Sequence, residues 1–206
     1  MAAWQFAFVV IPVAGIIRAH GRMVEVLPEY AARVDDASVD ADQVFPNYWE
    51  GFDNTAMQVV AASVLPVATS WCDEAAMYGN SETDDIEIWE DSVRVRLDCG
   101  NLNFALLAAV LNAVRAANCC VVLCAGGRII SPVLQLVTDA LHASAATRFV
   151  NDPGGFVDAR GAQLQGRFLS VLNRLGACIP VDLTAHATHH ESRALPKNQI
   201  SQRRLQ

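Results

Sequence analysis

Residues 86–98 read Ile-Glu-Ile-Trp-Glu-Asp-Ser-Val-Arg-Val-Arg-Leu-Asp, and this stretch is the clearest structural signal in the chain. From Val93 to Asp98, apolar residues alternate with charged ones, so the two kinds of side chain point to opposite faces of an extended strand. The polar turn Glu90–Ser92 separates this run from Ile86–Trp89. The pattern predicts a β-hairpin with one buried face and one solvated face.

Two further strands are expected on either side of this hairpin in the chain. Trp4–Val13 is a continuous apolar run rich in Phe, Val and Ile, which is typical of a strand covered on both faces. Cys119–Ala125 is a shorter run of the same kind, and the turn Gly126-Gly127 ends it. Because successive side chains alternate across a strand, we expect Cys119 and Cys120 to face opposite sides of the sheet.

Helices are expected between these strands. Asn54 is suited to cap a helix over residues 55–65, and Asn103 one that runs to residue 117. The expected buried stripe of the second helix is Phe104, Leu107, Leu111 and Val114. The order strand, helix, hairpin, helix, strand is the β-α-β-β-α-β order of a ferredoxin-like α+β core.

The remaining segments are expected to decorate this core. Residues 21–54 form an insertion after the first strand, with a short strand at Met23–Leu27. Ser131-Pro132 predicts the start of a helix that ends near Ala143, Asn151–Gly155 predicts a turn, and residues 162–175 predict a last helix. The domain organisation expected is a single domain over residues 1–182 and a flexible polar tail over residues 183–206.

The composition favours a soluble, cytoplasmic protein. Of the 206 residues 52% are hydrophobic, which is enough for one large core. The longest apolar run, Phe6–Ile17, is shorter than the roughly 20 residues of a membrane-spanning helix. A signal peptide begins with a positively charged segment, whereas residues 1–5 contain no Lys or Arg. We therefore expect no membrane association.

Motifs for catalysis, cofactors and metals are absent from the sequence. The six cysteines form no CxxC pair, so buried free thiols are expected. Gly126-Gly127-Arg128 lacks the pattern of a nucleotide-binding loop. His186, His189 and His190 do not have the spacing of zinc ligands. We therefore predict no catalytic residue, no cofactor and no metal site.

Charge is distributed unevenly along the chain. Residues 1–100 contain 17 acidic and 5 basic residues, whereas residues 101–206 contain 5 acidic and 10 basic ones. An acidic half repels nucleic acid and anionic membranes and attracts basic protein surfaces. This asymmetry predicts a protein partner with a basic surface and excludes nucleic acid.

Tryptophans lie beside carboxylates at three places in the acidic half. Aromatic anchors rimmed by charge are typical of protein-binding hot spots, although each tryptophan could also be a core residue with an acidic neighbour. The predicted partner-binding residues are Trp49, Glu50, Asp53, Trp71, Asp73, Glu74, Asp84, Asp85, Glu87, Trp89, Glu90 and Asp91.

Several short signatures together resemble those of small bacterial immunity proteins, which neutralise secreted toxins. The signatures are Tyr48-Trp49-Glu50-Gly51, Leu65-Pro66 with Ser70-Trp71, Val93–Asp98, and Ser144-Ala145 with Phe149–Pro153. The resemblance implies a protein without chemistry of its own that binds and inhibits a cognate toxin. An acidic face would suit a toxin with a basic, nucleic-acid-binding or nucleotide-binding cleft.

A second hypothesis is a small enzyme or ligand-binding domain whose pocket lies between the insertion and the sheet. A homodimer that pairs the open sheet face or an edge strand is compatible with either hypothesis. A concave site with converging polar groups would favour the second hypothesis.

Overall fold

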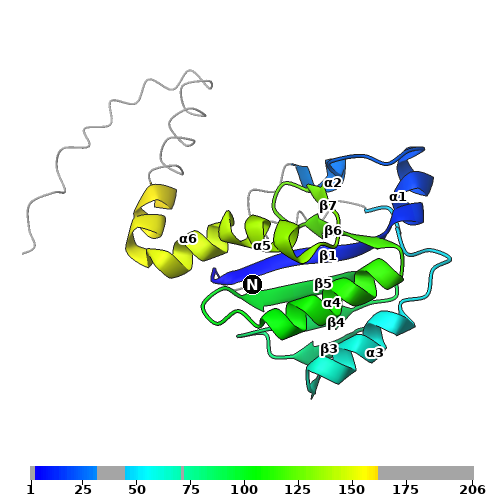
Figure 1. The fold of residues 1–206 in the computed structure, drawn as a ribbon, viewed down its shortest axis with the longest axis horizontal. Coiled ribbons are helices and arrows are strands. Elements are labelled where there is room, and N and C mark those ends of the chain that lie inside the picture. The colour runs from blue at the N-terminus through cyan, green and yellow to red at the C-terminus, as the bar shows by residue number, and fades with distance from the viewer. Residues whose placement is uncertain (1–2, 32–44, 71, 162–206) are drawn as a thin grey trace, which may run out of the picture. The chain divides into compact units, whose positions relative to one another are not determined.

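A computed structural model of the protein describes residues 3–31, 45–70 and 72–161. In these residues the chain forms one seven-stranded sheet with helices on both of its faces (Figure 1). The strands are β1 Gln5–Pro12, β2 Val67–Ala68, β3 Ala76–Gly79, β4 Asp85–Ile88, β5 Val93–Asp98, β6 Cys119–Leu123 and β7 Ile129–Ile130. The helices are α1 Val13–His20, α2 Pro28–Ala31, α3 Thr55–Val64, α4 Phe104–Ala116, α5 Leu134–His142 and α6 Ala145–Asn151. The predicted α+β class is confirmed.

Strand β1 lies near the middle of the sheet, whose order is β2-β3-β4-β5-β1-β6-β7. It pairs antiparallel with β5 on one side and with β6 on the other. All eight of its residues are buried. Because side chains alternate along a strand, β1 contributes Phe6, Phe8 and Val10 to one core and Ala7, Val9 and Ile11 to a second core.

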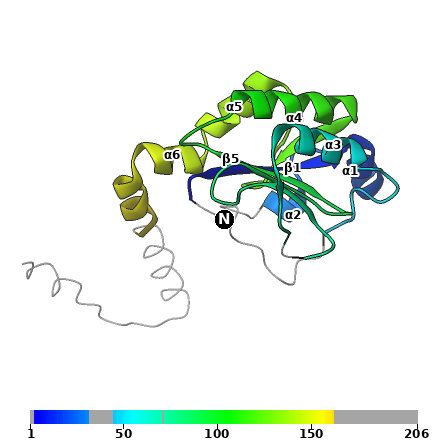
Figure 2. The same cartoon turned by 90° about the horizontal axis from the view of Figure 1, so that it is seen from below.

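The first core lies between the sheet and helices α3, α4 and α5, which share one face of the sheet (Figure 2). Helix α4 begins as predicted, with the Asn103 Oδ1 atom accepting a hydrogen bond from Leu106 N over 3.0 Å. Leu107, Leu111 and Val114 are buried as expected. Phe104 is not: it is 52% exposed, because it lies in the first turn of α4 at the margin of the packed layer.

The second core lies on the other face of the sheet and is closed by the chain that follows β1. Ile16 of α1, Leu27 and Tyr48 are fully or almost fully buried against β1 and β6. Gly15 lies in contact with the backbone of Tyr48, since a Cβ atom built on Gly15 would lie 2.1 Å from the Tyr48 carbonyl oxygen. Cys120 belongs to this core and Cys119 to the first one, which confirms their predicted opposite facing.

The predicted hairpin is confirmed as β4 and β5, but most of its charged face is buried. Asp85 pairs with Arg96 across the two strands, and Glu87 with Arg94. Asp85, Glu87 and Arg96 are only 2%, 8% and 9% exposed. The alternation correctly separated the two faces, but it carries no information on how deeply the charged face is buried.

The predicted helix over residues 55–65 is confirmed as α3, with Asn54 at its N-cap position, but the Asn54 side chain makes no capping hydrogen bond. The Thr55 N–H instead donates to Asp53 Oδ1 over 2.8 Å. The Asn54 side chain is turned away and donates to the Trp89 carbonyl oxygen. Helix α5 begins at Leu134 rather than beside Ser131-Pro132, because Val133 at its N-cap position is still extended.

The expected turn over residues 151–155 is also wrong. Asn151 ends α6, and a second helical stretch covers residues 153–161. Asp152 alone breaks the helix, and its Oδ1 atom accepts from Gly155 N over 2.9 Å. Proline at the first position of a helix needs no N–H partner, so Pro153 starts the second stretch instead of ending the structure.

The insertion after β1 is described only in part. The expected strand at Met23–Leu27 is reduced to a single bridge between Val26 and Arg128. Residues 32–44, the predicted helix over residues 162–175 and the predicted tail over residues 183–206 lie outside the described residues, as does the expected domain boundary at residue 182. The described residues up to Gly161 belong to one compact unit.

We predict that Gly15→Ala destabilises the protein by about 1–3 kcal/mol, because the added methyl group would overlap the Tyr48 backbone. Gly161→Ala is the matched control, since a Cβ atom there meets nothing within 4 Å. Urea unfolding of both variants measures the effect. An unfolding midpoint for Gly15→Ala equal to that of the control would contradict the close contact.

Candidate functional site

Three acidic segments meet at the end of the sheet where β1 runs into α1 (Figure 1). Strand β3 begins at Ala76, which pairs with Ile88 at the end of β4. Asp73 and Glu74, just before β3, therefore lie beside the residues that follow β4. The strand register thus brings together carboxylates that are 16 or more positions apart in the sequence, such as Glu74 and Glu90.

The turn between β4 and β5 carries the second segment. Trp89 N donates to the Ser92 carbonyl oxygen over 2.8 Å, which closes a tight turn. Glu90 and Asp91 lie at its tip, and both are exposed. Trp89 itself is half-buried beneath them.

The third segment is the loop before α3, which two hydrogen bonds fix to the sheet. The Trp49 Nε1 atom donates to the Val10 carbonyl oxygen over 3.0 Å, and the Asn54 Nδ2 atom donates to the Trp89 carbonyl oxygen over 2.7 Å. Between these anchors, Glu50 and Asp53 are exposed. Hydrogen bonds from the side chain and the backbone of Thr55 lower the pKa of Asp53, so its carboxylate is charged at neutral pH.

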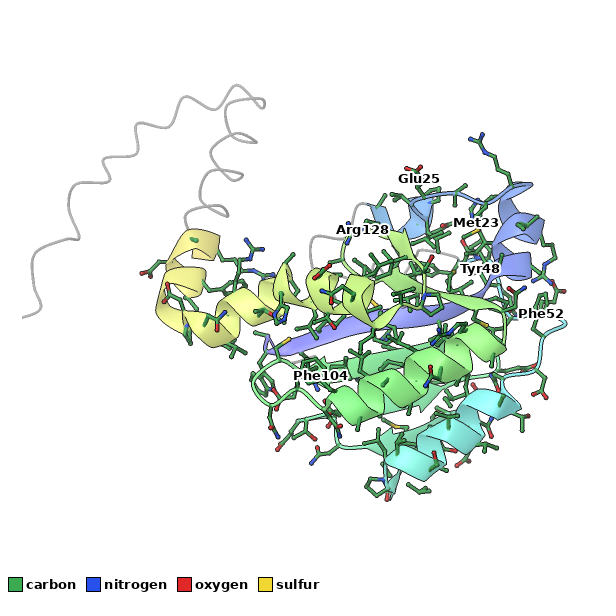
Figure 3. The ribbon with its side chains drawn as sticks, viewed as in Figure 1. Met23, Glu25, Tyr48, Phe52, Phe104 and Arg128 are labelled. Carbon is green, nitrogen blue, oxygen red and sulfur yellow. The ribbon has the colours of Figure 1, made fainter. Side chains whose placement is uncertain are left out.

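We call the exposed carboxylates of these segments the acidic end: Glu50, Asp53, Asp73, Glu74, Glu90 and Asp91. Phe52 lies at the margin of this surface and is 40% exposed (Figure 3). The Arg18 guanidinium lies 5.7 Å from the centre of the Phe52 ring and 3.7 Å from the Glu50 carboxylate. Among the described residues, Arg18 contacts only Glu50 of these six carboxylates, so the acidic end carries a net negative charge.

Six of the twelve predicted partner-binding residues belong to the acidic end. The other six are partly or fully buried, or lie outside the described residues. Trp49 is buried, and its ring anchors the loop rather than facing solvent. Trp71 lies outside the described residues. Asp84 is half-buried at the opposite end of β4, where its Oδ1 atom accepts from Asp98 N over 2.8 Å. Asp85 and Glu87 are buried in ion pairs, so they are not part of an exposed face.

Arg96 bridges these two buried carboxylates. Its Nε atom lies 2.7 Å from Asp85 Oδ1, and its Nη2 atom donates to Glu87. The second oxygen of Asp85 is buried and has no hydrogen-bond partner among the described residues. Burial raises the pKa of Asp85 to about 6, and Glu87 adds to this shift, while Arg96 opposes it. This cluster is a structural ion pair with an incompletely compensated charge.

The raised pKa of Asp85 predicts the direction in which the free energy of unfolding changes with pH. An unfolded aspartate titrates near pH 3.8, so charged Asp85 disfavours the folded state above about pH 6. Lowering the pH from about 6 to 4 should therefore stabilise the wild type relative to Asp85→Asn, by about 2–3 kcal/mol. Chemical unfolding of both proteins across this range measures the difference.

Asp91→Asn is the control for this prediction, because Asp91 is exposed in the turn. A constant difference in unfolding free energy between wild type and Asp85→Asn from pH 4 to 7 would show that burial does not raise the pKa of Asp85.

A polar cluster that the sequence did not reveal joins α1, α2 and the segment 45–52. The His20 Nε2 atom lies 3.0 Å from the Tyr48 hydroxyl and 3.8 Å from Glu29 Oε1. Burial, with a smaller effect of Glu29, raises the pKa of Tyr48, so its hydroxyl stays protonated and acts as a donor. No sequence motif marks these residues, because they are 9 to 28 positions apart on three elements.

A cavity of about 400 Å³ lies between the insertion and the sheet, where the second hypothesis expected a pocket. The insertion side is formed by Met23, Val24 and Glu25 (Figure 3). The other sides are formed by α1, the end of α4, the start of β6, and β7 with the residues after it. Their lining residues are Val13, Arg115, Asn118, Cys119, Cys120, Ile129, Ile130, Ser131 and Pro132. The cavity is not lined by His20, Glu29 or Tyr48.

The chemistry open to this cavity is binding rather than thiol nucleophilic attack. Burial raises the pKa of Cys119 to about 11 and that of Cys120 to about 12, so both thiols are protonated at neutral pH. A protonated thiol behaves as a small apolar group. In the described part of the chain, no group of three or more His, Cys, Asp or Glu side chains could hold a metal ion.

Within the described ranges, no helix is both long enough and apolar enough to cross a bilayer. No family model, curated protein or solved structure matches the chain at a significant level.

Proposed function

We propose that the protein is a non-enzymatic binding module that recognises a basic surface of a partner protein through its acidic end. The observation that carries this proposal is the grouping of six exposed carboxylates around Phe52 and Trp89 on fixed backbone. Charged groups at the rim of an interface steer the encounter, and aromatic side chains supply the buried contact. Both are present at the acidic end.

The rigidity of this surface supports a role in binding. Two of the three segments, the loop before α3 and the β4–β5 turn, are tied to the sheet and to each other by the hydrogen bonds of Trp49, Asn54 and Trp89. The third segment, with Asp73 and Glu74, directly precedes strand β3. A surface that is already ordered loses little conformational entropy when a partner binds. Nucleic acid is disfavoured as the partner, because phosphates and these carboxylates repel each other.

We further propose that the partner is a toxin and that the protein is an immunity protein. The support is the resemblance of the short signatures together with the negative charge of the acidic end, which is suited to a basic toxin cleft. Among the described cysteines, Cys72, Cys99, Cys119 and Cys120 are free thiols, which supports a reducing, cytoplasmic setting.

We also propose that β1, α3, β4, β5, α4 and β6 form a ferredoxin-like core. Their chain order is β-α-β-β-α-β, and these four strands lie in the order β4-β5-β1-β6 with antiparallel neighbours. Strands β2, β3 and β7 would then be additions to its two edges.

The test compares three baits in pull-downs from a lysate of the native organism, with partners identified by mass spectrometry. They are the wild type, the acidic-end variant Glu74→Lys/Glu90→Lys/Asp91→Lys, and the control Glu82→Lys/Asp139→Lys/Asp158→Lys. Both variants change the net charge equally at exposed positions. We expect wild type and control to retain the same basic protein, and the acidic-end variant to retain at least tenfold less of it.

Recovery of the same proteins, in the same amounts, on all three baits would contradict the proposal. Thermal unfolding of both variants checks that the loss is not caused by misfolding. If the retained protein is a toxin, its activity should fall when the wild type is added and stay unchanged when the acidic-end variant is added at the same concentration.

The second candidate function, a ligand-binding domain, is favoured by the cavity between the insertion and the sheet. This cavity lies on the β6–β7 side of β1, whereas the acidic end is built from β3, β4 and the loop before α3. The two functions are therefore compatible with each other.

A further inference from the structure

The cavity beside β6 and β7 is fixed by backbone hydrogen bonds on two sides. Ile129 N donates to the Glu25 carbonyl oxygen over 2.8 Å, which holds the insertion against the edge of the sheet. Val13 N donates to the Asn118 carbonyl oxygen over 3.2 Å. Asn118 has a φ of 51°, in the left-handed region, which turns the chain sharply from α4 into β6. The walls of the cavity are thus part of the fold.

The lining is part apolar and part polar. Val24, Ile129 and Ile130 are half-buried and line it together with Cys119 and Cys120. Met23 is 43% exposed at the cavity, although it is apolar. A volume of about 400 Å³ is near the lower limit of small-molecule sites, so the cavity suits a compact apolar group.

Two residues of opposite charge, Glu25 of the insertion and Arg115 of α4, line the same cavity. Arg115 lies in the last turn of α4, and its Nη2 atom donates to Asn112 Oδ1 over 2.6 Å. This bond orients the guanidinium and uses one of its five N–H groups, so paired donors remain for a carboxylate. Glu25 supplies a carboxylate on the insertion side, and Ser131 adds a hydroxyl group.

We propose that this cavity binds a free α-amino acid with an apolar side chain. The ligand's carboxylate pairs with Arg115, its ammonium group pairs with Glu25, and its side chain packs against Val24 and Ile130. A ligand with a single charge would satisfy one of the two cavity charges, and a ligand without an apolar group would leave the interior surface uncovered. This inference does not depend on the function of the acidic end.

Isothermal titration calorimetry on the full-length protein tests the proposal with leucine, isoleucine and phenylalanine. We expect saturable binding of at least one of them with one site per chain. For leucine, 4-methylpentanoate lacks the ammonium group, 3-methylbutylamine lacks the carboxylate, and glycine lacks the side chain. Each comparison compound should bind at least about tenfold more weakly than its parent amino acid, because a charged hydrogen bond or an apolar contact is lost.

Variants of the two charged residues give a second readout. Glu25→Gln and Arg115→Gln change exposed side chains, so the fold should tolerate both. Each should weaken binding of the amino acid at least about tenfold. The controls Glu82→Gln and Arg148→Gln, which are exposed elsewhere, should leave the affinity unchanged.

Three results would overturn the proposal: no binding of any of the three amino acids to wild type, equal binding of the singly charged compounds, or unchanged affinity in Glu25→Gln and Arg115→Gln. The acidic-end variant Glu74→Lys/Glu90→Lys/Asp91→Lys should bind the amino acid like wild type. This separates failure of the cavity proposal from failure of the partner proposal.

Discussion

The pairing of β1 with both β5 and β6, under burial on both faces, is the constraint on which the rest of the structure depends. A strand buried on both faces needs apolar side chains at every position and a covering layer on each side. The sequence Phe6–Pro12 meets the first requirement. The layer of α3, α4 and α5 and the opposite layer of α1, Leu27 and Tyr48 meet the second. The contact between Gly15 and the Tyr48 backbone shows how tightly the smaller layer is packed.

The same strand positions both candidate sites. Its register with β5 fixes β4 and β3 in turn, and these strands bring Asp73, Glu74, Glu90 and Asp91 to one end of the sheet. Its Val10 carbonyl oxygen anchors Trp49 and with it the loop that carries Glu50 and Asp53. On the other side, pairing with β6 places Cys119 and Cys120 at the base of the cavity. The two proposed recognition surfaces thus lie on opposite sides of one strand.

Local sequence patterns predicted which residues form strands and helices better than they predicted how those residues are buried and paired. Alternation identified β4 and β5, and Asn103 identified the start of α4, because both signals depend on neighbouring residues alone. The burial of Asp85, Glu87 and Arg96 depends on pairing between strands, so sequence gave no sign of it. The Ser131-Pro132 signal placed the start of α5 slightly too early, because Val133 is still extended. Six of the twelve residues predicted for partner binding form the acidic end, but their grouping required the sheet register. The cluster of His20, Glu29 and Tyr48 left no local pattern at all.

We propose that the acidic end is the surface that recognises a basic partner protein. The most direct test of this proposal is an NMR titration of the ¹⁵N-labelled protein with a hexa-arginine peptide at low salt. We expect the largest amide shifts in residues 50–54, 72–75 and 89–92, and we expect them to disappear at high salt, because exposed charges are screened. Amide shifts that leave these three segments unchanged, while other parts of the described chain respond, would contradict the account.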